Sequence, residues 1–463
     1  MASLVLGIDS STQSTKTLLV DAETGQVLEE RRSSHPDGTE VDPRAWLDAV
    51  DEAAGPLLER ADALAVGGQQ HGMVLLDEAG EVVRDALLWN DTRSADAATT
   101  LIEEMGGAQA SVEEIGSLMV ASFTASKLRW VRDEEPENAQ RAARVLLPHD
   151  FVSLHLAESG TAPFTDRGDA SGTGYYSTRE EAWKPELVEA ALGKGLELPR
   201  LPEAPNEVMA RTASGAAIAA GTGDNMGAAL GLSLGPGDVS VSIGTSGVCA
   251  MVSDTRPGDA SGTVTGFADA TGRFLPMTTT INASRILEAG RALLGVSHEE
   301  MAELALASEP GARGVTLLPY FDGERTPNRP HARATLTGMS SSTTREDVAR
   351  AYVEGLLCSL ADGIAALEER TGTAARRITL IGGGARSRAV QQLAPAIFGR
   401  EVTIAPDGEY VALGAACQAA WALAGTEKPP AWEISGSRTV TADATPQVLE
   451  AYRELKERTA DWS

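Results

Sequence analysis

The sequence contains few cysteines and no obvious metal-binding pattern. Its three cysteines are Cys249, Cys358 and Cys417, and no two of them have the spacing of metal ligands. An odd and sparse set is typical of a reducing compartment, where cysteines serve as small hydrophobic residues. The six histidines include no pair at i and i+4, so a zinc-binding helix is not indicated.

Basic residues are outnumbered by acidic ones. Lys and Arg number 39 against 66 Asp and Glu, which gives a formal net charge of -27 at pH 7. A surface of this sign repels the phosphate backbone and anionic lipid, so we expect no nucleic acid and no membrane as partners. An anionic ligand must then be bound by local backbone amides, a metal ion or a few placed cations.

Long apolar runs and several catalytic motifs are also missing. No window approaches 18 uninterrupted apolar residues, and the apolar run before Asp9 is too short for a signal peptide, so a cytoplasmic location is expected. The sequence lacks G-x-x-x-x-G-K-[ST], which excludes a P-loop enzyme, and G-x-S-x-G, which argues against an α/β-hydrolase. No glycine motif has the strand, helix and later acidic residue of a dinucleotide-binding fold.

The length of the chain and its strand and helix patterns indicate two α/β domains. A chain of 463 residues exceeds one ordinary core, and its 42% hydrophobic and 23% charged residues are normal for a globular protein. We predict domains over residues 1–230 and 231–463. No low-complexity linker separates them, so we expect them to face a common cleft.

A strand–turn–strand pattern occurs twice, roughly half a chain apart. Residues 4–8 and 17–20 are apolar around a hydroxyl-rich turn, and residues 239–243 and 248–252 are apolar around Gly244, Thr245 and Ser246. Two such turns, each offering backbone amides and hydroxyls, indicate a duplicated domain with a phosphate held between the copies.

Hydrophobic periodicity predicts the remaining elements. Helices are expected over residues 44–60, 95–105, 226–232, 345–371 and 409–424, and strands over residues 27–31, 63–66, 378–381 and 402–404.

The first motif that can carry chemistry is residues 9–16, Asp-Ser-Ser-Thr-Gln-Ser-Thr-Lys. A carboxylate at a strand end, a tight turn of hydroxyl residues and a lysine make a workable site for a metal-bound polyphosphate. Asp9 would hold Mg²⁺, while the turn amides and the Thr12 hydroxyl would bind phosphate oxygens. An ordinary β-hairpin with a polar turn fits the same residues.

The second motif is residues 221–227, Gly-Thr-Gly-Asp-Asn-Met-Gly. Asp224 follows a flexible stretch and precedes a helix-forming run, which would place its carboxylate at a helix N-terminus. Backbone amides there would favour the ionised form of the carboxylate. A simple helix cap is the structural alternative.

The third and fourth motifs are glycine-rich loops that follow predicted strands. In residues 67–73, Gln70 and His71 could hydrogen-bond several hydroxyls of a neutral polyol at the carboxyl end of a strand. In residues 382–387, three glycines would let a flat ring lie against bare backbone, as an adenine or ribose pocket requires. A surface histidine and an ordinary strand-to-helix turn explain these loops equally well when each is taken alone.

In this order the motifs resemble the FGGY family of carbohydrate kinases over nearly the whole chain. Residues 9–16 and 242–247 resemble its two phosphate motifs, and residues 382–387 its adenosine motif. Residues 122–134 and 319–327 resemble two further family signatures. The resemblance implies two actin-like, RNase H-like domains that close over a ligand cleft, with the sugar mainly on the first and the nucleotide mainly on the second. One departure is Ser11, where the family usually has glycine.

The loop Gly-Gln-Gln-His-Gly at residues 68–72, together with residues 40–46, 88–93 and 147–151, resembles the branch of the family that phosphorylates D-xylulose. The resemblance implies in-line transfer of the ATP γ-phosphoryl group to the sugar 5-hydroxyl, with MgATP and a small sugar as ligands. It implies Asp224 as general base and Asp9 as a catalytic and metal-binding carboxylate. The implied sugar ligands are Gln70, His71, Asp224 and Asn225. The implied nucleotide and phosphate ligands are Ser11, Thr12, Lys16, Gly244, Thr245, Ser246, Gly383, Gly384 and Arg388.

Two alternatives stay open at this point. The chain could phosphorylate another small ketose or an alditol, or it could be a non-catalytic actin-fold ATPase. The sugar loop together with Asp224 and Asn225 argues against the second alternative. The assembly state is also open, a homodimer being one option.

Overall fold

The computed structural model describes residues 3–462, which form two compact units that alternate along the chain. The first unit contains the residues up to 234 together with 254–275 and 409–433, and the second contains 235–253, 276–408 and the residues from 434 onward. The single boundary near residue 230 stays a prediction. No helix within residues 3–462 is long and apolar enough to cross a membrane.

The first unit is built on a mixed sheet with the order β11-β12-β5-β1-β2-β3, in which β13 also pairs with β5. These strands are β1 (Leu4–Ser10), β2 (Ser14–Asp21), β3 (Val27–Ser34), β5 (Ala63–Gly68), β11 (Val208–Arg211), β12 (Ala217–Ala219) and β13 (Thr222–Gly223). Its helices are α1 (Arg44–Ala53), α2 (Gly55–Leu58), α3 (Ala95–Glu104), α4 (Ala108–Ile115), α5 (Thr124–Glu134), α6 (Pro136–Arg141), α7 (Pro148–Leu156), α8 (Arg167–Ala170), α9 (Pro185–Leu192), α10 (Asp224–Gly231) and α15 (Tyr410–Ala424). Short strands are β4 (Glu40–Val41), β6 (Val74–Leu76), β7 (Ala86–Leu87), β8 (Arg144–Leu146), β9 (Tyr176–Ser177), β10 (Ala182–Trp183) and β16 (Thr265–Ala268).

The second unit contains a sheet with the order β17-β15-β14-β20-β21-β22. These strands are β14 (Asp238–Ile243), β15 (Gly247–Met251), β17 (Phe274–Thr280), β20 (Arg377–Ile381), β21 (Val402–Ile404) and β22 (Arg438–Val440), and a separate ribbon pairs β18 (Thr316–Leu318) with β19 (Thr335–Thr337). Its helices are α11 (Ser284–Leu294), α12 (His298–Ala307), α13 (Arg345–Thr371), α14 (Arg388–Phe398) and α16 (Pro446–Arg458), with short 3₁₀ turns η1 (Ala312–Gly314) and η2 (Gly383–Arg386).

The two sheets repeat one arrangement of strands. In the first, β1 pairs antiparallel with β2 and parallel with β5, which in turn pairs parallel with β12. In the second, β14 pairs antiparallel with β15 and parallel with β20, which pairs parallel with β21. An antiparallel edge strand follows in both, β11 and β22, although the two enter the sheets at different points of the chain order. The repeat predicted from the two strand–turn–strand patterns is confirmed, and with it the two-domain α/β class.

Most predicted elements lie where the periodicity placed them, and one is wrong. The helix predicted over residues 44–60 ends at Ala53, and a separate short helix begins at Gly55. Pro56 explains the break, because a proline lacks the amide hydrogen that a helix interior needs and fits only in the first turn. The helix expected from residue 226 begins two residues earlier, at Asp224.

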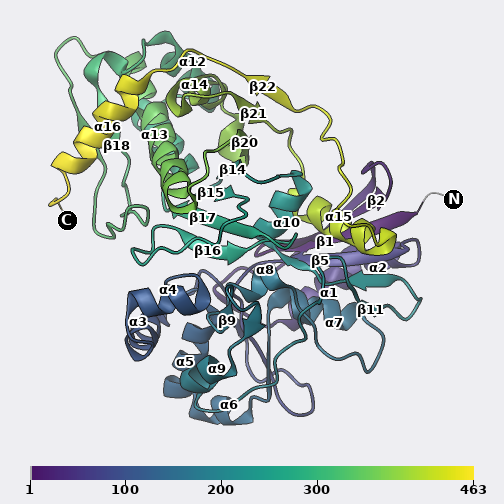
Figure 1. The fold of residues 1–463 in the computed structure, drawn as a ribbon. Coiled ribbons are helices and arrows are strands. Elements are labelled where there is room, and N and C mark those ends of the chain that lie inside the picture. Colours follow the sequence, from purple (N-terminus) through teal and green to yellow (C-terminus); the bar gives the residue numbers. More distant parts are fainter. Residues whose placement is uncertain (1–2, 463) are drawn as a thin grey trace. The chain divides into compact units, whose positions relative to one another are not determined.

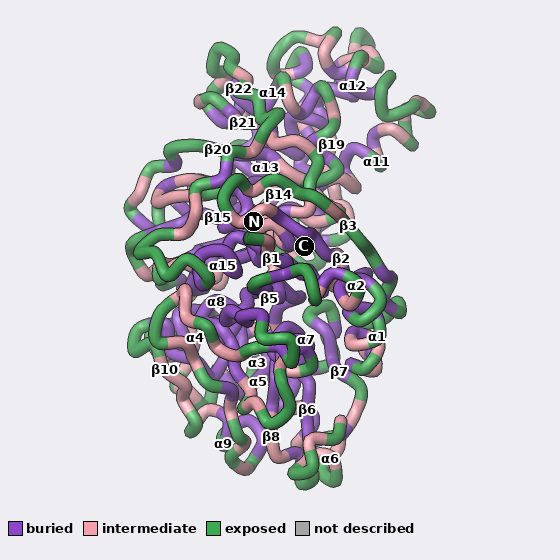
Figure 2. The backbone as a smooth tube through the Cα atoms, turned by 90° about the vertical axis from the view of Figure 1, so that its right-hand side faces the viewer, coloured by how far each residue is buried: buried purple, intermediate pink, exposed green. Residues whose placement is uncertain are grey.

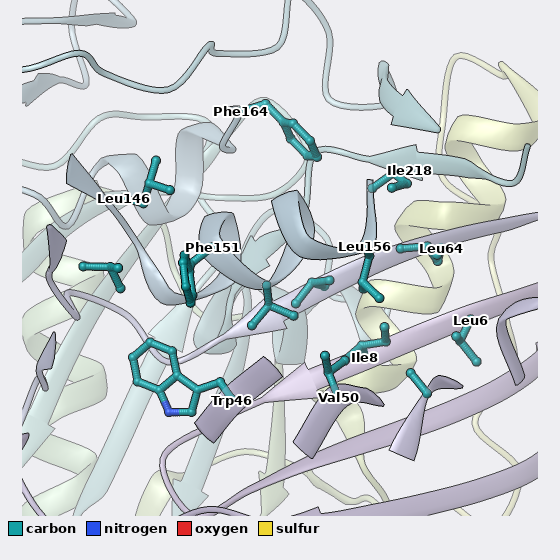
Figure 3. Packing of buried hydrophobic residues seen from close by; sticks show 14 of the residues in the cluster. Leu6, Ile8, Trp46, Val50, Leu64, Leu146, Phe151, Leu156, Phe164 and Ile218 are labelled. Carbon is teal, nitrogen blue, oxygen red and sulfur yellow. The ribbon is translucent and has the colours of Figure 1, made fainter. Parts of the chain in front are cut away.

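Alternating side chains of β1 face two different layers. Leu6 and Ile8 point into the apolar cluster formed with α1 and α7, where Trp46 and Val50 are buried beside them (Figure 3). Because successive strand residues face opposite sides, Gly7 and Asp9 must face the other layer. That layer is α15, which lies beside β1 and α10 in Figure 1.

The packing of α15 brings backbone directly against backbone. A Cβ added to Gly7 would lie 1.9 Å from the carbonyl oxygen of Ala412, and one added to Gly414 would lie 1.9 Å from that of Gly227. Only glycine allows such an approach. Most of β1 and α15 is buried chain, as Figure 2 shows. The same close packing places the first residues of α15 next to the end of β1 that carries Asp9.

Candidate active site

Asp9 is the last residue but one of β1 and lies on the face of the sheet that α15 covers. Its carboxylate is 2% exposed and accepts a hydrogen bond from the Ser11 hydroxyl. Burial raises the pKa of Asp9 to about 6, although the Ser11 bond and the charge of Lys16 oppose the rise. The family usually has glycine at this position. Ser11 instead gives the Asp9 carboxylate a hydrogen-bond donor that glycine could not offer.

Lys16 pairs across the same turn with a residue that the sequence did not indicate. Its ammonium lies 2.5 Å from a carboxylate oxygen of Glu409 and 3.9 Å from one of Asp9. Glu409 directly precedes α15, 393 residues away in the chain, so no local pattern could have revealed it. The predicted phosphate ligand is thus held between two carboxylates, and an incoming phosphate would compete with Glu409 for it.

Asp224 is the first residue of α10, and Gly223 is the cap. Its Oδ1 accepts hydrogen bonds from both the main-chain and side-chain nitrogens of Asn225, each at 2.8 Å. The expectation that the ionised form is favoured at this helix N-terminus is wrong. Burial, together with the charges of Asp9 and Asp169, raises the pKa of Asp224 to about 7 and outweighs the two hydrogen bonds.

Gln70, Asn225 and Asp224 form one hydrogen-bonded chain. The side-chain nitrogen of Asn225 donates to Gln70 Oε1 at 3.0 Å as well as to Asp224. Gln70 also packs on Gly223, where an added Cβ would lie 2.9 Å from its Cγ. Its Nε2 is buried and has no hydrogen-bond partner within residues 3–462, which leaves a donor that a ligand hydroxyl can satisfy.

His71 has a left-handed backbone with φ of 67°. Its Nδ1 lies 2.8 Å from the carbonyl oxygen of Gly172, and since a carbonyl only accepts, Nδ1 carries the proton and Nε2 the lone pair of the neutral ring. The ring stacks on Phe123 with centroids 5.0 Å apart, and Phe267 lies 5.6 Å away. The imidazole is therefore fixed in tautomer and plane, as recognition of hydroxyls requires.

Lys127, within the signature at residues 122–134, was not among the predicted site residues. It is fully buried on α5 and donates to the carbonyl oxygens of His71, at 3.0 Å, and of Ser122. Burial lowers its pKa to about 7 despite the charge of Asp91. The role of the signature lysine is to hold the main chain of the sugar loop.

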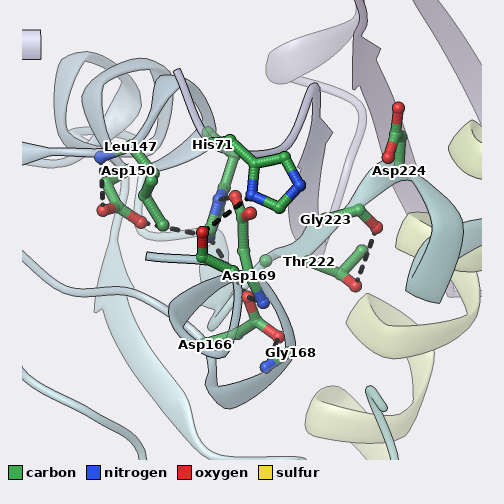
Figure 4. Close-up of polar contacts among 12 residues, drawn as sticks. His71, Leu147, Asp150, Asp166, Gly168, Asp169, Thr222, Gly223 and Asp224 are labelled. Carbon is green, nitrogen blue, oxygen red and sulfur yellow. Dashed lines mark hydrogen bonds and ion pairs between the residues drawn. The ribbon is translucent and has the colours of Figure 1, made fainter. Parts of the chain in front are cut away.

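Thr12, the remaining ligand predicted in the first turn, accepts a hydrogen bond from the indole nitrogen of Trp89 at 2.9 Å. Trp89 is 47% exposed, which is unusual for a residue so large. The first unit thus gathers several predicted residues near the carboxyl ends of β1, β5 and β13, namely Asp9, Ser11, Thr12, Lys16, Gln70, His71, Asp224 and Asn225. Two of them, His71 and Asp224, are labelled in Figure 4.

The second unit holds the other predicted phosphate turn between β14 and β15. The carbonyls of Gly244 and Thr245 accept hydrogen bonds from Ser284 and Ala283, which ties the turn to the start of α11. Glu324, from the signature at residues 319–327, accepts from the amide of Ile281 at 2.5 Å. The signature at residues 319–327 therefore contacts the segment that lies beside the phosphate turn. Within the turn, the Ser246 hydroxyl donates to the carbonyl oxygen of Ile281 at 3.4 Å.

The predicted adenosine loop lies at the end of β20 in the same unit. Gly384 packs on Ile243, since an added Cβ would lie 2.3 Å from its Cγ2, whereas a Cβ at Gly383 would meet nothing within 4 Å. Gly383 and Arg388 are both exposed, the latter as the first residue of α14. One glycine is thus required for packing and the other leaves open surface above the loop.

A duplicated sheet that carries polar residues at corresponding strand ends has the architecture of a carbohydrate kinase. The profile of the FGGY family of carbohydrate kinases, N-terminal domain, matches residues 4–232, and that of its C-terminal domain matches residues 239–423. The chain belongs to the FGGY family of carbohydrate kinases.

Several relatives share most of its length. A xylulose kinase from Streptomyces coelicolor is 46% identical over 440 residues, which are 92% of this chain and 89% of that protein. One from Streptomyces rubiginosus is 43% identical over 459 residues, 95% of this chain and 92% of that protein. The crystal structure of xylulose kinase from Bifidobacterium adolescentis superposes with a TM-score of 0.92 at 46% identity, covering 98% of this chain and 99% of that one.

Proposed function

We propose that this protein transfers the γ-phosphoryl group of ATP to the 5-hydroxyl of D-xylulose and releases D-xylulose 5-phosphate and ADP. The names of the relatives, two of them above 40% identity over nearly the whole chain, support the choice of sugar. The observation that carries the reaction is the hydrogen-bonded chain from Gln70 through Asn225 to Asp224. It joins a carboxylate with a pKa near 7 to an unpaired buried donor in the sugar loop.

Asp224 acts as the general base in this proposal. A base works best when its pKa lies near the working pH, because it is then largely ionised and still takes up a proton readily. The sugar hydroxyl loses its proton to Asp224 as the new P–O bond forms and the bond to the ADP oxygen breaks. Since phosphoryl-transfer transition states are loose, positioning and charge stabilisation matter more than the strength of the base.

Sugar hydroxyls are recognised by neutral groups in the first unit. Gln70 Nε2 would donate, His71 Nε2 would accept, and Asn225 would orient both the sugar and Asp224. Neutral donors and acceptors suit a polyol that carries no charge. In the second unit, Gly244, Thr245 and Ser246 would bind phosphate oxygens, and Gly383, Gly384 and Arg388 would face the nucleoside.

The residues present fit a magnesium ion carried by the nucleotide. No cluster of three or more His, Cys, Asp or Glu that could hold a metal occurs within residues 3–462, yet Mg²⁺ bound with a nucleotide needs only one or two carboxylates beside phosphates and water. The charge of Asp9 raises the pKa of Asp224, and a divalent cation at Asp9 would relieve that repulsion. When bound, Mg²⁺ neutralises charge on the transferred phosphate. We further propose that the enzyme works in the cytoplasm, which its three buried, unpaired cysteines favour.

The test is ADP release from MgATP by the purified protein with D-xylulose, L-ribulose, D-ribulose, glycerol or no sugar. Strong stimulation by D-xylulose alone is expected. Stimulation by another sugar only would keep the kinase and overturn the choice of substrate. ADP release that no sugar alters would overturn the proposal in favour of a non-catalytic actin-fold ATPase.

A further inference from the structure

His149 lies in the segment 147–151, and none of the roles described above uses it. The imidazole is completely buried and contacts three buried carboxylates. Its Nδ1 lies 2.8 Å from Asp169 Oδ2, and its Nε2 lies 3.1 Å from Asp150 and 3.7 Å from Asp166. Burial alone would lower the pKa of His149, but these carboxylates raise it to about 10. Burying a charged histidine and its carboxylate partners away from water costs free energy of folding. Packing alone does not explain why the residues at these positions are charged.

The His149 side chain touches both loops that carry ligand-facing residues. A Cβ added to Gly68, at the end of β5, would lie 2.9 Å from the His149 Cβ. A Cβ added to Gly221, three residues before Asp224, would lie 2.5 Å from the His149 Cδ2. Both positions are glycine, so the ring and its own Cβ fix how far apart the sugar loop and the Asp224 loop can be.

Asp169 connects the same ring to His71. The Asp169 carboxylate accepts from the main-chain amide of His71, beside which Figure 4 shows it, and also from the His149 ring. On its other side, the carbonyl of His71 accepts from Lys127. Both main-chain groups of a residue in a left-handed conformation are therefore held by buried charged side chains. Such a conformation persists only where the surroundings enforce it.

We propose that His149 and Asp169 are positioning residues for sugar recognition: the pair holds the His71 main chain and sets the spacing between the sugar loop and Asp224. This inference rests on the proposed sugar phosphorylation and names residues through which it acts. The charge of Asp169 matters because its Oδ2 lies 2.8 Å from the buried His149 ring, where a carboxylate balances the charge of an imidazolium. In Asp169→Asn the neutral amide would no longer balance the charge of the His149 ring, so the hydrogen bond between the two side chains is weakened.

The experiment compares steady-state kinetics of Asp169→Asn and His149→Gln with wild type. We expect the KM for D-xylulose to rise by roughly tenfold or more, as for one lost charged hydrogen bond, while the KM for ATP stays within about twofold. His155→Gln is the matched control, since His155 forms a comparable pair with Asp51 at the surface. A folded variant that keeps a wild-type KM for the sugar overturns the assignment.

A double-substitution cycle separates positioning from general stability. If Asp169 acts through His71, Asp169→Asn should add no more than about twofold to the sugar KM once His71→Ala is present. If the two substitutions multiplied each other's effects on the KM for the sugar, Asp169 would act independently of His71 and the proposal would be overturned.

A measurement on the unsubstituted protein covers the case in which both variants fail to fold. With ¹⁵N-labelled histidine, His149 is the imidazolium that keeps two protons through pH 8. Its ring signals should shift on addition of D-xylulose, because the sugar would bind to the two loops that the ring contacts at Gly68 and Gly221. Signals that D-xylulose leaves unchanged overturn the positioning role. Sugar-independent ADP release by wild type overturns the proposed function, and this role with it, whereas an active wild type with unaffected variants overturns this role alone.

Discussion

Asp9 and Asp224 share an environment that favours their neutral forms. Both pKa values are raised chiefly by burial, to about 6 and about 7, and the charge of Asp9 adds to the shift at Asp224. These are the two carboxyl groups to which we assign magnesium binding and acceptance of the sugar proton. The site is also strained electrostatically in the absence of ligands.

The pH profile of the reaction should report both groups. Because the base must be ionised, kcat/KM for D-xylulose should level off above pH 7 and fall about tenfold per pH unit below it. Below pH 6 the fall should steepen as Asp9 also binds a proton. Initial rates from pH 5 to 9 at saturating MgATP test this. A flat profile between pH 5.5 and 7.5 would contradict the roles of both carboxylates.

Replacing the proposed base should stabilise the protein while removing activity. The pKa of Asp224 is higher in the folded state than the 3.8 expected for an exposed aspartate, so its ionisation costs stability as pH rises from about 4 to 7. Asp224→Asn should therefore lower kcat by about 10²–10⁴ and raise the unfolding free energy at pH 8 on the order of 1 kcal/mol. The gain should be smaller at pH 5, where the wild-type carboxyl holds a proton.

Substitution of Asp347 is a control that should change stability in the opposite direction to Asp224→Asn. Its hydrogen bond from Arg313 keeps its pKa well below the usual range, so its contribution to stability is present above pH 4 and is lost as pH falls. Asp347→Asn should lower the melting temperature at pH 8 without changing the KM for D-xylulose. Calorimetry of both variants at pH 5 and pH 8 checks the two signs. Destabilisation by Asp224→Asn at pH 8 would contradict the account of its pKa.

Among the elements, α15 does the most to hold the first unit together. It meets β1 and α10 at Gly7, Gly231 and Gly414, where no side chain fits. Its own sequence is rich in alanine, which keeps the helix narrow and favours helix formation.

Gly414→Ala should destabilise the first unit although it raises helix propensity. The new methyl group would lie 1.9 Å from the Gly227 carbonyl oxygen, so backbone must move, at a cost of about 1–3 kcal/mol. Gly55→Ala is the matched control, because a Cβ there meets nothing within 4 Å in the described structure. Urea unfolding of both variants measures the difference. Equal unfolding free energies for Gly414→Ala and Gly55→Ala would show that α15 can move away from α10 without loss of stability.

The loop after β20 allows a separate test of nucleotide binding. Because nothing lies within 4 Å of a Cβ at Gly383, Gly383→Ala should leave the melting temperature unchanged. If the nucleoside lies on this loop, the KM for ATP should rise roughly tenfold, and more for Gly383→Val, with the KM for D-xylulose unaltered. Gly384→Ala is the contrast, since its methyl group would meet Ile243 and should cost stability. An unchanged KM for ATP in both Gly383 variants would remove this loop from the nucleotide site.

At the scale of the whole molecule, the same six-strand order occurs twice, while the chain passes more than once between the units. The first unit takes α15 from residues 409–433, after most of the second unit has been made. Its stability therefore depends on residues that are distant in sequence.

A fragment of residues 1–234 should not fold alone. It would expose the glycine faces of β1 and α10 that α15 covers, together with the apolar surface around them. Joining residue 234 to 409–433 through a short Gly/Ser linker should restore much of the fold, because Gly231 and Tyr410 are in backbone contact. Circular dichroism and urea unfolding of both chains test this. Cooperative unfolding of the 1–234 fragment would contradict it.

Local patterns alone determined a large part of this protein. Strand residues 4–8 and 239–243, each followed by a turn of small polar residues, are specified by short-range alternation, and helix 345–371 by its period and the glycine that ends it. The candidate residues Asp9, Gln70 and Asp224 follow strand ends, where the sequence rules of α/β sheets place ligand contacts. These features need only a few neighbouring residues, so they can be recognised in the sequence.

The tertiary structure decided what depends on distant partners. The contact of Lys16 with Glu409, the pairing of His149 with Asp169 and the hold of Lys127 on the His71 carbonyl join residues that are 393, 20 and 56 positions apart. The pKa of Asp224 was predicted wrongly for the same reason. A helix N-terminus is a local feature, whereas burial and the charges of Asp9 and Asp169 arise only when separate strands and helices come together.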